Sequence, residues 1–166
     1  MTRLMGWVNP MQEPKRKNRF EVLLEDDLRL AACSIGLPKY TIEDVKIHRM
    51  HNLYKVSGSK ITYDDITIKF YDFVDNKAGR KLDDWHKQVY NINTSLMGFP
   101  AEYKRNLTIL MYGPDNSVVE SWLLVGAWPK TVSRPDLDWS DGAGVIEVTL
   151  TLAIDEAKLI LSSGTV

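Results

Sequence analysis

Apolar and polar residues alternate along residues 145–154, and this pattern restricts the possible fold more than any other in the chain. The apolar positions are Ile146, Val148, Leu150, Leu152 and Ile154. The polar positions between them are Glu147, Thr149 and Thr151. Because successive side chains of a β-strand point to opposite faces, we expect a strand with one side on a hydrophobic core and the other side in water.

The same alternation occurs in two earlier segments. In residues 61–73 the core side is Ile66, Ile68 and Phe70, and the wet side is Asp65, Thr67 and Lys69. In residues 18–25 the core side is Phe20, Val22 and Leu24. We expect a turn at residues 25–27 and a return strand over residues 28–34 that pairs with this strand as a hairpin. The repeated pattern predicts antiparallel sheets with one covered and one solvated face.

Residues 76–92 change their apolar period from two to about 3.6. The apolar positions of this segment are Ala78, Leu82, Trp85, Val89 and Ile92. This spacing predicts an amphipathic α-helix that packs its apolar stripe against a sheet. Asn76 can cap the helix, since its side-chain oxygen can accept a hydrogen bond from an unpaired N–H of the first turn.

Further strands are expected over residues 41–50, 103–112 and 117–125, the last two joined by a Gly-Pro-Asp-Asn turn. The polar run of residues 51–60, which contains Gly58, predicts a hairpin tip. We therefore predict a mainly β fold with barrel-like or sandwich-like antiparallel sheets and one α-helix packed on the sheet. The length fits a single domain over residues 1–166.

The composition, with 44% apolar and 26% charged residues, is that of a soluble globular protein. No run approaches the ~18 apolar residues of a membrane span, and no secretory signal is visible, so we expect a cytoplasmic chain without membrane insertion. The single cysteine, Cys33, excludes an intramolecular disulfide, and a small buried side chain is favoured there over a nucleophile. A net charge of −1 lacks the basic excess of a tight nucleic-acid binder.

Charge is unevenly distributed along the chain. Residues 1–20 contain one acidic residue, Glu13, and the basic residues Arg3, Lys15, Arg16, Lys17 and Arg19. Residues 134–156 contain one basic residue, Arg134, and the acidic residues Asp136, Asp138, Asp141, Glu147, Asp155 and Glu156. Opposite charges suit head-to-tail stacking of copies, and two independent solvated segments explain them equally well. Prolines and basic residues predict a flexible N-terminal arm over residues 1–17.

No constellation of residues indicates catalysis, a metal or a cofactor. His48 and His51 lie near each other, but no Cys or carboxylate completes a tetrahedral set with them. Adjacent carboxylates such as Asp64 and Asp65 point to opposite faces of a strand and do not converge as an acid/base pair. No glycine-rich phosphate loop is present. The sequence therefore predicts a protein that is not an enzyme and holds no cofactor.

The chain contains five tryptophans: Trp7, Trp85, Trp122, Trp128 and Trp139. Gathered on one surface, they would suit a carbohydrate-binding platform. Several lie in helix, strand or corner contexts that are typical of cores and of seams between subunits, so we favour this second role.

Several motifs follow one another in a fixed order over roughly residues 60–154. The central helix is followed by Pro100-Ala101-Glu102-Tyr103-Lys104, then by a strand that runs through Gly126 into Trp128-Pro129. Leu137-Asp138-Trp139 and an Asp-Gly turn precede the final strand, Glu147-Val148-Thr149-Leu150. This order resembles the tail-tube proteins of contractile-tail bacteriophages, the myovirus tail-tube family.

The resemblance implies a structural subunit. Strands from several copies would join into one continuous multi-chain β-barrel, and hexameric rings would stack into a hollow tube inside a contractile sheath that conducts viral DNA into the host. The wet strand faces would line the lumen with Asp65, Thr67, Lys69, Glu147, Thr149 and Thr151. Such a polar, near-neutral lining would let DNA pass without sticking.

The resemblance also implies contacts between rings. In the family, the region of residues 50–60 forms a projecting loop that touches the neighbouring ring. Inter-ring contacts are therefore expected from Met50, His51, Tyr54, Lys55, Ser57 and Gly58, and from Lys15, Arg16 and Lys17 of the arm. Core or corner positions are expected for Trp85, Trp128, Pro129 and Trp139.

The expected partners are copies of the chain itself, a sheath protein, a baseplate tube-initiator and a tail terminator. A tape-measure protein and viral DNA would occupy the lumen without sequence-specific binding. The chain would be made and assembled in the host bacterial cytoplasm and would reside in the tail tube of the virion.

Three alternatives remain. The same fold would serve a related contractile injection or type VI secretion-like system that carries protein cargo. A small-ligand barrel or enzyme would stay monomeric and would need convergent polar residues in a pocket, which the sequence does not indicate. A baseplate tube-initiator would carry extra domains, for which this length leaves little room.

Overall fold

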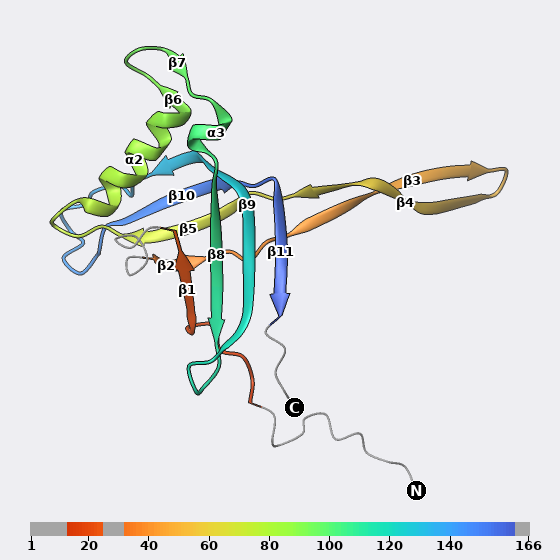
Figure 1. Cartoon of the computed structure of the whole chain (residues 1–166), viewed down its shortest axis with the longest axis horizontal. Coiled ribbons are helices and arrows are strands. Elements are labelled where there is room, and N and C mark those ends of the chain that lie inside the picture. The colour runs from red at the N-terminus through yellow and green to blue at the C-terminus, as the bar shows by residue number, and fades with distance from the viewer. Residues whose placement is uncertain (1–12, 25–31, 162–166) are drawn as a thin grey trace, which may run out of the picture.

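The computed structural model describes residues 13–24 and 32–161, which form a bent, two-layered β-sheet, two helices and a long hairpin (Figure 1). In chain order the elements are β1 (Phe20–Leu23), β2 (Ala32–Ile35), β3 (Tyr40–Arg49), β4 (Asn52–Tyr63), β5 (Ile66–Tyr71), α2 (Lys77–Val89), β6 (Tyr90–Asn91), β7 (Leu96–Met97), α3 (Pro100–Tyr103), β8 (Arg105–Tyr112), β9 (Val118–Ser133), β10 (Glu147–Ala153) and β11 (Glu156–Leu161).

Strand β9 belongs to two sheets. The first sheet comprises β1, β8, residues 118–127 of β9, and β11; the second sheet comprises residues 128–133 of β9, β10, β5 and β2. Their strand pairs are antiparallel. In Figure 1, β8 and β11 run vertically, whereas β5 and β10 run across them. The predicted mainly β, antiparallel fold is confirmed.

The hydrophobic core lies between the two sheets. The apolar positions expected from the alternation are buried in β5 and β10: Ile66, Ile68, Phe70, Val148, Leu150 and Leu152. The first sheet contributes Val22, Leu107, Ile109 and Leu124 from the other side. Burial of each such side chain contributes roughly 1.5–3 kcal/mol, so this double layer is the main source of the stability of the fold.

Strand β9 bends where it passes from the first sheet to the second, beside the Trp128-Pro129 pair. Gly126 has a φ of 67° at this bend, a backbone conformation that strains other residues. A Cβ atom at this position would collide with the carboxylate of Asp155. The Gly126 N–H donates to Asn106 Oδ1 at 3.2 Å, which holds the bend in place.

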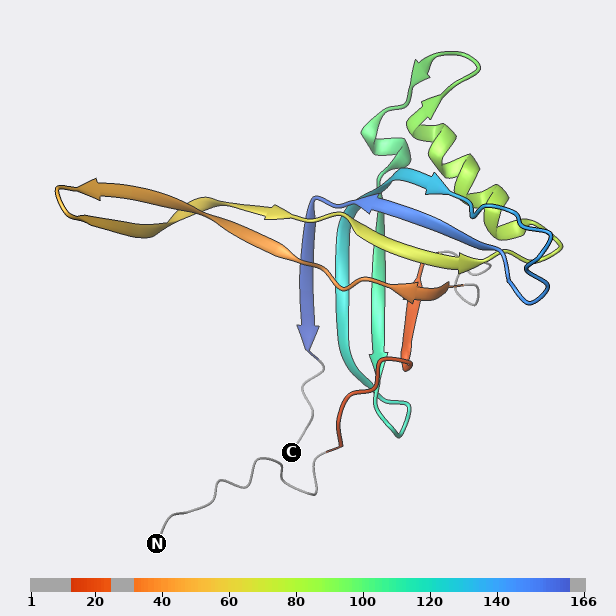
Figure 2. The ribbon, with the colours of Figure 1, turned by 180° about the vertical axis from the view of Figure 1, so that it is seen from behind.

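Strands β3 and β4 form a twisted ribbon that extends far from the body in both views (Figures 1 and 2). The sequence placed a hairpin tip over residues 51–60, and this was wrong: the turn lies at Met50 and His51, and strand β4 begins at Asn52. Gly58 allows the backbones of β3 and β4 to approach closely, since a Cβ there would lie 2.7 Å from the Glu43 carbonyl oxygen.

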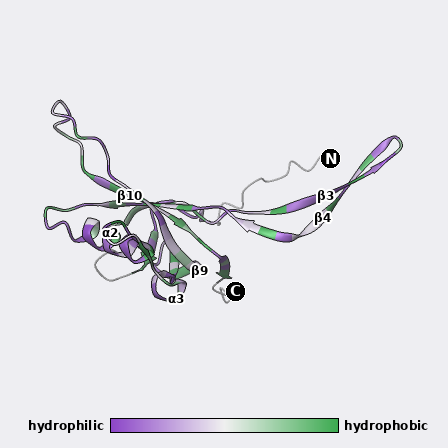
Figure 3. Cartoon of the chain, turned by 90° about the horizontal axis from the view of Figure 1, so that it is seen from above, coloured by the Kyte–Doolittle hydropathy of each residue, from purple (hydrophilic) through white to green (hydrophobic). Residues whose placement is uncertain are grey.

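Helix α2 covers the core on the same side of β10 as the body of β9 (Figure 3). Its apolar stripe is buried through Ala78, Leu82 and Trp85. The expected Asn76 cap was wrong, because Asn76 adopts φ 52° and its side chain makes no capping hydrogen bond. Asp75 Oδ1 accepts from the Lys77 N–H at 3.2 Å instead.

The helix ends three residues earlier than expected, at Val89. The Gly98 N–H donates to the Val89 carbonyl at 3.0 Å, and Ile92 is 76% exposed beyond the helix end. A second, short helix, α3, occupies Pro100–Tyr103 and corrects the expectation of one helix; proline favours its first turn. Neither described helix has the length and apolar run needed to cross a membrane.

Strands β1 and β2 do not pair with each other. The sequence analysis expected a local hairpin, whereas β1 pairs with β8 and β2 pairs with β5. Val22 lies opposite Ile109, and Ile35 lies opposite Ile68, so each strand joins the sheet that buries its apolar side. The expected turn at residues 25–27 lies outside the described residues.

Candidate assembly surfaces

The polar side of the second sheet carries the residues expected to line a lumen. Antiparallel pairing places Lys69 opposite Thr149 and Thr67 opposite Thr151. Thr67 and Lys69 are exposed, and Glu147, Thr149 and Thr151 are half-buried. The sheet therefore gathers these side chains into one hydrophilic surface, on the face opposite to the core.

Two ion pairs balance the charges on this surface. Lys69 Nζ lies 3.4 Å from Glu147 Oε2, and Lys130 Nζ lies 2.6 Å from Asp65 Oδ2. Asp65 belongs to the turn before β5 and reaches the surface from its edge. Sequence reasoning missed Lys130, although its position beside Pro129 on the wet side of a strand could have indicated it.

Both edges of the second sheet are open within the described residues. Within the described residues, strand β2 forms backbone pairs only with β5. Residues 128–133 of β9 form backbone pairs only with β10. Unpaired backbone N–H and C=O groups at such edges can pair with another chain. The arrangement can therefore extend the sheet into a neighbouring molecule.

The β3–β4 ribbon has no layer of its own to pack on. All ten residues of β3 are exposed, and its contacts are mainly with β4. The expected contact residues lie along the outer half of the ribbon, residues 44–57, and just beyond it: Met50, His51, Tyr54, Lys55 and Ser57 lie within this half, and Gly58 follows it. Met50, at the turn, is 97% exposed.

Apolar residues of the ribbon were missed by the sequence analysis. Its exposed apolar side chains include Ile42, Val45, Ile47, Val56 and Ile61. An isolated two-stranded hairpin is only marginally stable in water, so such side chains indicate a surface that another molecule covers. The apolar residues at Val45 and Ile47, two positions apart in a predicted strand, were the available signal.

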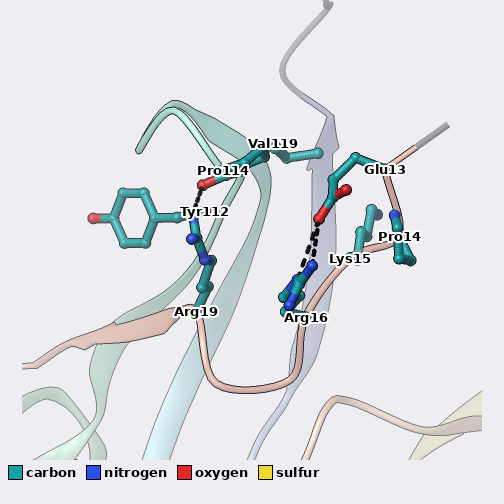
Figure 4. A pocket seen from close by; sticks show the side chains of 9 residues that line it. Glu13, Pro14, Lys15, Arg16, Arg19, Tyr112, Pro114 and Val119 are labelled. Atoms are coloured by element: carbon teal, nitrogen blue, oxygen red, sulfur yellow. Dashed lines mark hydrogen bonds and ion pairs between the residues drawn. The ribbon is translucent and has the colours of Figure 1, made fainter. Parts of the chain in front are cut away.

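The basic segment lies elsewhere, against the turn between β8 and β9 (Figure 4). Lys15 forms an ion pair with Glu120, and Arg16 forms one with Glu13 at 2.9 Å. Hydrogen bonds from Lys15 and from the Trp122 indole lower the pKa of Glu120. The structure therefore does not bring Lys15, Arg16 and Lys17 together with the outer half of the ribbon (Figure 1).

The four residues expected at the core or corner have different environments. Trp85 is 2% exposed, and its indole N–H donates to the Tyr103 carbonyl at 2.7 Å. Pro129 is buried, and Trp128 is half-buried with its ring edge on Tyr103. Trp139 is 105% exposed and therefore lies outside the core of this chain, on the loop between β9 and β10.

The β9–β10 loop, residues 134–146, presents further exposed apolar side chains. Leu137, Val145 and Ile146 join Trp139 there, although the alternation had placed Ile146 in the core. Strand β10 begins only at Glu147, so Ile146 lies outside the buried ladder. Asp138 accepts hydrogen bonds from the Ser140 N–H and hydroxyl, and these bonds lower its pKa.

The described residues contain no group of three or more His, Cys, Asp or Glu side chains that could hold a metal ion. Several of their carboxylates form ion pairs or turn hydrogen bonds at the surface, among them Glu147, Asp65 and Asp138. The surfaces assembled here are suited to contacts between chains.

Comparison with known proteins gives the following matches. The family model described as T4-like virus tail tube protein gp19 matches residues 16–158. A tail tube protein of Serratia phage KSP90 is 24% identical over 79 residues, which are 47% of this chain and 45% of that protein. The matched region thus spans less than half the length of this curated relative.

Two solved structures share the fold at low sequence identity. A chain in the cryo-EM structure of the anti-feeding prophage tube-terminating cap has a TM-score of 0.73 and 18% identity, with 97% of this chain and 100% of that chain covered. A chain in the PVC sheath-tube complex of an extracellular contractile injection system has a TM-score of 0.68 and 17% identity, with coverages of 92% and 95%.

Proposed function

Because the chain belongs to the T4-like virus tail tube protein family, we propose that it is a structural subunit of a phage tail tube. In this proposal hexameric rings stack into a hollow tube inside a contractile sheath, and the tube conducts viral DNA into the host. The subunit catalyses no reaction. It acts through the shape and polarity of the assembly.

The observation that carries the proposal is the open second sheet with its polar face. Four strand segments alternate in direction from residues 128–133 of β9 through β10 and β5 to β2, so the two edge strands run oppositely. Copies placed side by side by rotation can therefore continue an antiparallel ladder at every seam. Closure of the ring removes all the edges, which is how barrels avoid uncontrolled edge pairing.

The polar face of this sheet is the proposed lumen lining. Thr67, Thr149 and Thr151 offer hydroxyl groups, and the Lys69–Glu147 and Lys130–Asp65 pairs leave the surface without net charge. Phosphates bind to proteins chiefly through excess positive charge, so this lining would hold DNA weakly. Helix α2 and the first sheet lie on the other side and would form the outer wall.

Axial stacking is assigned to the β3–β4 ribbon, whose outer half includes Met50, Tyr54 and Lys55. The basic segment with Lys15, Arg16 and Lys17 supports the contact from the end of the first sheet. The tube would also bind a sheath protein, a baseplate tube-initiator and a tail terminator, with a tape-measure protein and DNA in the lumen. Synthesis and assembly would take place in the host bacterial cytoplasm, before incorporation into the virion.

A tube of a related contractile injection or type VI secretion-like system is the second candidate. The likeness to a chain in the PVC sheath-tube complex favours it, and the electroneutral lining suits protein cargo as well. Isolation of the native particles separates the two: nuclease-protected DNA supports a phage, whereas co-isolated protein cargo without DNA supports an injection system.

Negative-stain microscopy of the purified chain tests the proposal directly. We expect rings and long hollow tubes, and a strictly monomeric protein at high concentration would overturn it. Replacement of Ser57, Gly58 and Ser59 by bulky residues should leave a folded monomer that forms no tubes. Long tubes from that variant would refute the role of the ribbon.

Labelling of cysteine tests the lumen assignment. In a Cys33→Ser background, Thr67→Cys should react with a small maleimide in tubes but not with one attached to a large polymer, since the polymer cannot enter the bore. Asp84→Cys, on the exposed face of α2, is the matched control and should react with both reagents. Equal reaction of both reagents at Thr67→Cys along intact tubes would place that face outside.

A further inference from the structure

The end of the molecule opposite the ribbon carries a second exposed apolar surface. It consists of Leu137, Trp139, Val145 and Ile146 of the β9–β10 loop, which we call the terminal patch. Leu137 is 83% exposed and Trp139 is 105% exposed. Large aromatic side chains are seldom left in water without a partner, and tryptophan is enriched at the energetic centres of interfaces.

The terminal patch is acidic. Asp136, Asp138 and Asp141 flank Trp139 in the sequence of the loop, and no ion pair within the described residues involves these three carboxylates. Arg134, the basic residue of the loop, is engaged with Asp83 of α2 at 2.5 Å. The patch therefore combines apolar area with uncompensated negative charge.

The outer half of the ribbon, residues 44–57, has the complementary properties. Its pairing places Val45 opposite Val56 and Ile47 opposite Tyr54, which gives one apolar face. Arg49 lies over the Tyr54 ring at 5.2 Å, at the edge of this face. The outer half also carries Lys46 and Lys55 against the single carboxylate of Asp44, so it is apolar and basic.

The positions of the two surfaces exclude a contact within one molecule. The ribbon and the β9–β10 loop lie at opposite ends of the molecule along its longest axis (Figure 1), and both turn toward the same side in Figure 3. A surface at one end that fits a different surface at the other end generates a repeating head-to-tail contact, which stays open when its rotation does not close into a ring. The ribbon strands span roughly 30 Å at about 3.3 Å per residue, so the outer half lies well away from the body.

We propose that the apolar face formed by Val45, Ile47, Tyr54 and Val56 docks on the terminal patch of a copy in the next ring. This inference rests on the proposed tube function and names the receiving surface of its axial contact. Trp139 is the central anchor, and Arg49 faces the carboxylates around it. Lys46 and Lys55 lie on the reverse of the ribbon, where Lys55 forms an ion pair with Asp44 at 3.4 Å.

Truncation of the anchor is the first test. Trp139→Ala removes no buried contact of the isolated chain, so the monomer should unfold at the same denaturant concentration as wild type. The critical concentration for tube formation should rise roughly tenfold or more, as expected for loss of an interface tryptophan. Leu96→Ala truncates a 68% exposed residue of β7 and is the matched control. It should leave the critical concentration for tube formation unchanged.

Cross-linking is the second test. In a Cys33→Ser background, Lys55→Cys combined with Gly142→Cys should give a ladder of covalent oligomers when tubes are treated with a short bis-maleimide. Gly142 is suitable because a side chain there meets open space. Lys55→Cys combined with Asp84→Cys should give no ladder.

The outcomes separate the two proposals. If the wild-type chain forms no tubes, the proposed function fails and this inference fails with it. If tubes form but Trp139→Ala assembles like wild type, the docking assignment alone is wrong. Should the double-cysteine variant fail to assemble, the Trp139→Ala measurement still decides between docking and no docking.

Discussion

The two-sheet body and the β3–β4 ribbon are built from similar alternating sequences but reach opposite environments. In β5 and β10 every second side chain is buried, and Ile68, Phe70 and Leu150 have no exposed surface. In β3 the equally apolar Val45 and Ile47 are about half exposed, at 49% and 47%. Alternation thus specifies a strand with an apolar face, and topology decides whether the same chain covers that face.

The difference indicates two sources of stability. The body buries its apolar area within one chain and should fold as a monomer. The ribbon is stabilised only by side-chain pairs between its two strands. Its ordered structure therefore depends on contact with another molecule. Variants that act on the body should change unfolding, whereas variants of the ribbon should change assembly.

Matched leucine truncations give the sharpest contrast. Leu150→Ala leaves a cavity in the core and should lower the free energy of unfolding by about 2–5 kcal/mol. Leu53→Ala, in strand β4 with the side chain 49% exposed, should change it by less than about 0.5 kcal/mol in the monomer. Urea unfolding below the assembly concentration measures both. If Leu150→Ala and Leu53→Ala lowered the free energy of unfolding equally, the proposed difference between body and ribbon would be wrong.

A pair of glycine substitutions tests the bend that joins the two layers. Gly126→Ala forces a side chain into the left-handed backbone region and against Asp155, and should cost about 1–3 kcal/mol from backbone strain alone. Gly142→Ala, whose added methyl meets no atom within 4 Å, should stay within about 0.5 kcal/mol of wild type. Thermal unfolding compares the stability of the two variants. If Gly126→Ala were as stable as wild type, the bend would accept a side chain at this position.

The smallest effect concerns the ion pair between Lys15 and Glu120, at the margin of the body. Since the folded pKa of Glu120 is lowered, the pair stabilises the fold above the ordinary glutamate pKa of about 4.3, and this contribution is lost as pH falls through the lower folded value. Glu120→Gln should cost about 0.2–1 kcal/mol at neutral pH and nothing in strong acid.

Lys15→Gln should remove most of the same pH dependence, because the Lys15 hydrogen bond is the main cause of the shift. Urea unfolding across the acidic range measures both variants. An unchanged pH profile in Lys15→Gln would assign the stabilisation to the Trp122 hydrogen bond instead.

The buried faces of the body were predictable from the sequence, because a period of two fixes which residues share a side. Val22, Phe70 and Leu152 are buried as their spacing indicates. The pairing of β1 with β8 was not predictable in this way, since nearby segments were assumed to pair and Phe20 lies opposite Met111. Long-range pairing depends on which apolar faces fit, and periodicity carries no information about the partner.

The candidate surfaces were only partly predictable. The alternating pattern predicted that the polar residues of β5 and β10 share one face, and the strand register confirms this. The structure also places Lys130 there, in an ion pair with Asp65. The exposure of Trp139 could not be read from its type, because an aromatic residue fits a core and an interface equally well. Its position depends on a loop that leaves the sheet, and loop direction is set by tertiary contacts.

Strand β9 runs without interruption through both layers of the wall. Force applied to the first sheet therefore reaches the second through peptide bonds and ladder hydrogen bonds, in addition to side-chain packing. Sliding of one layer over the other would require breaking this strand's hydrogen bonds on both sides of Gly126. In the proposed tube, these two layers should accordingly resist shear as a single elastic plate when a contracting sheath drives the tube forward.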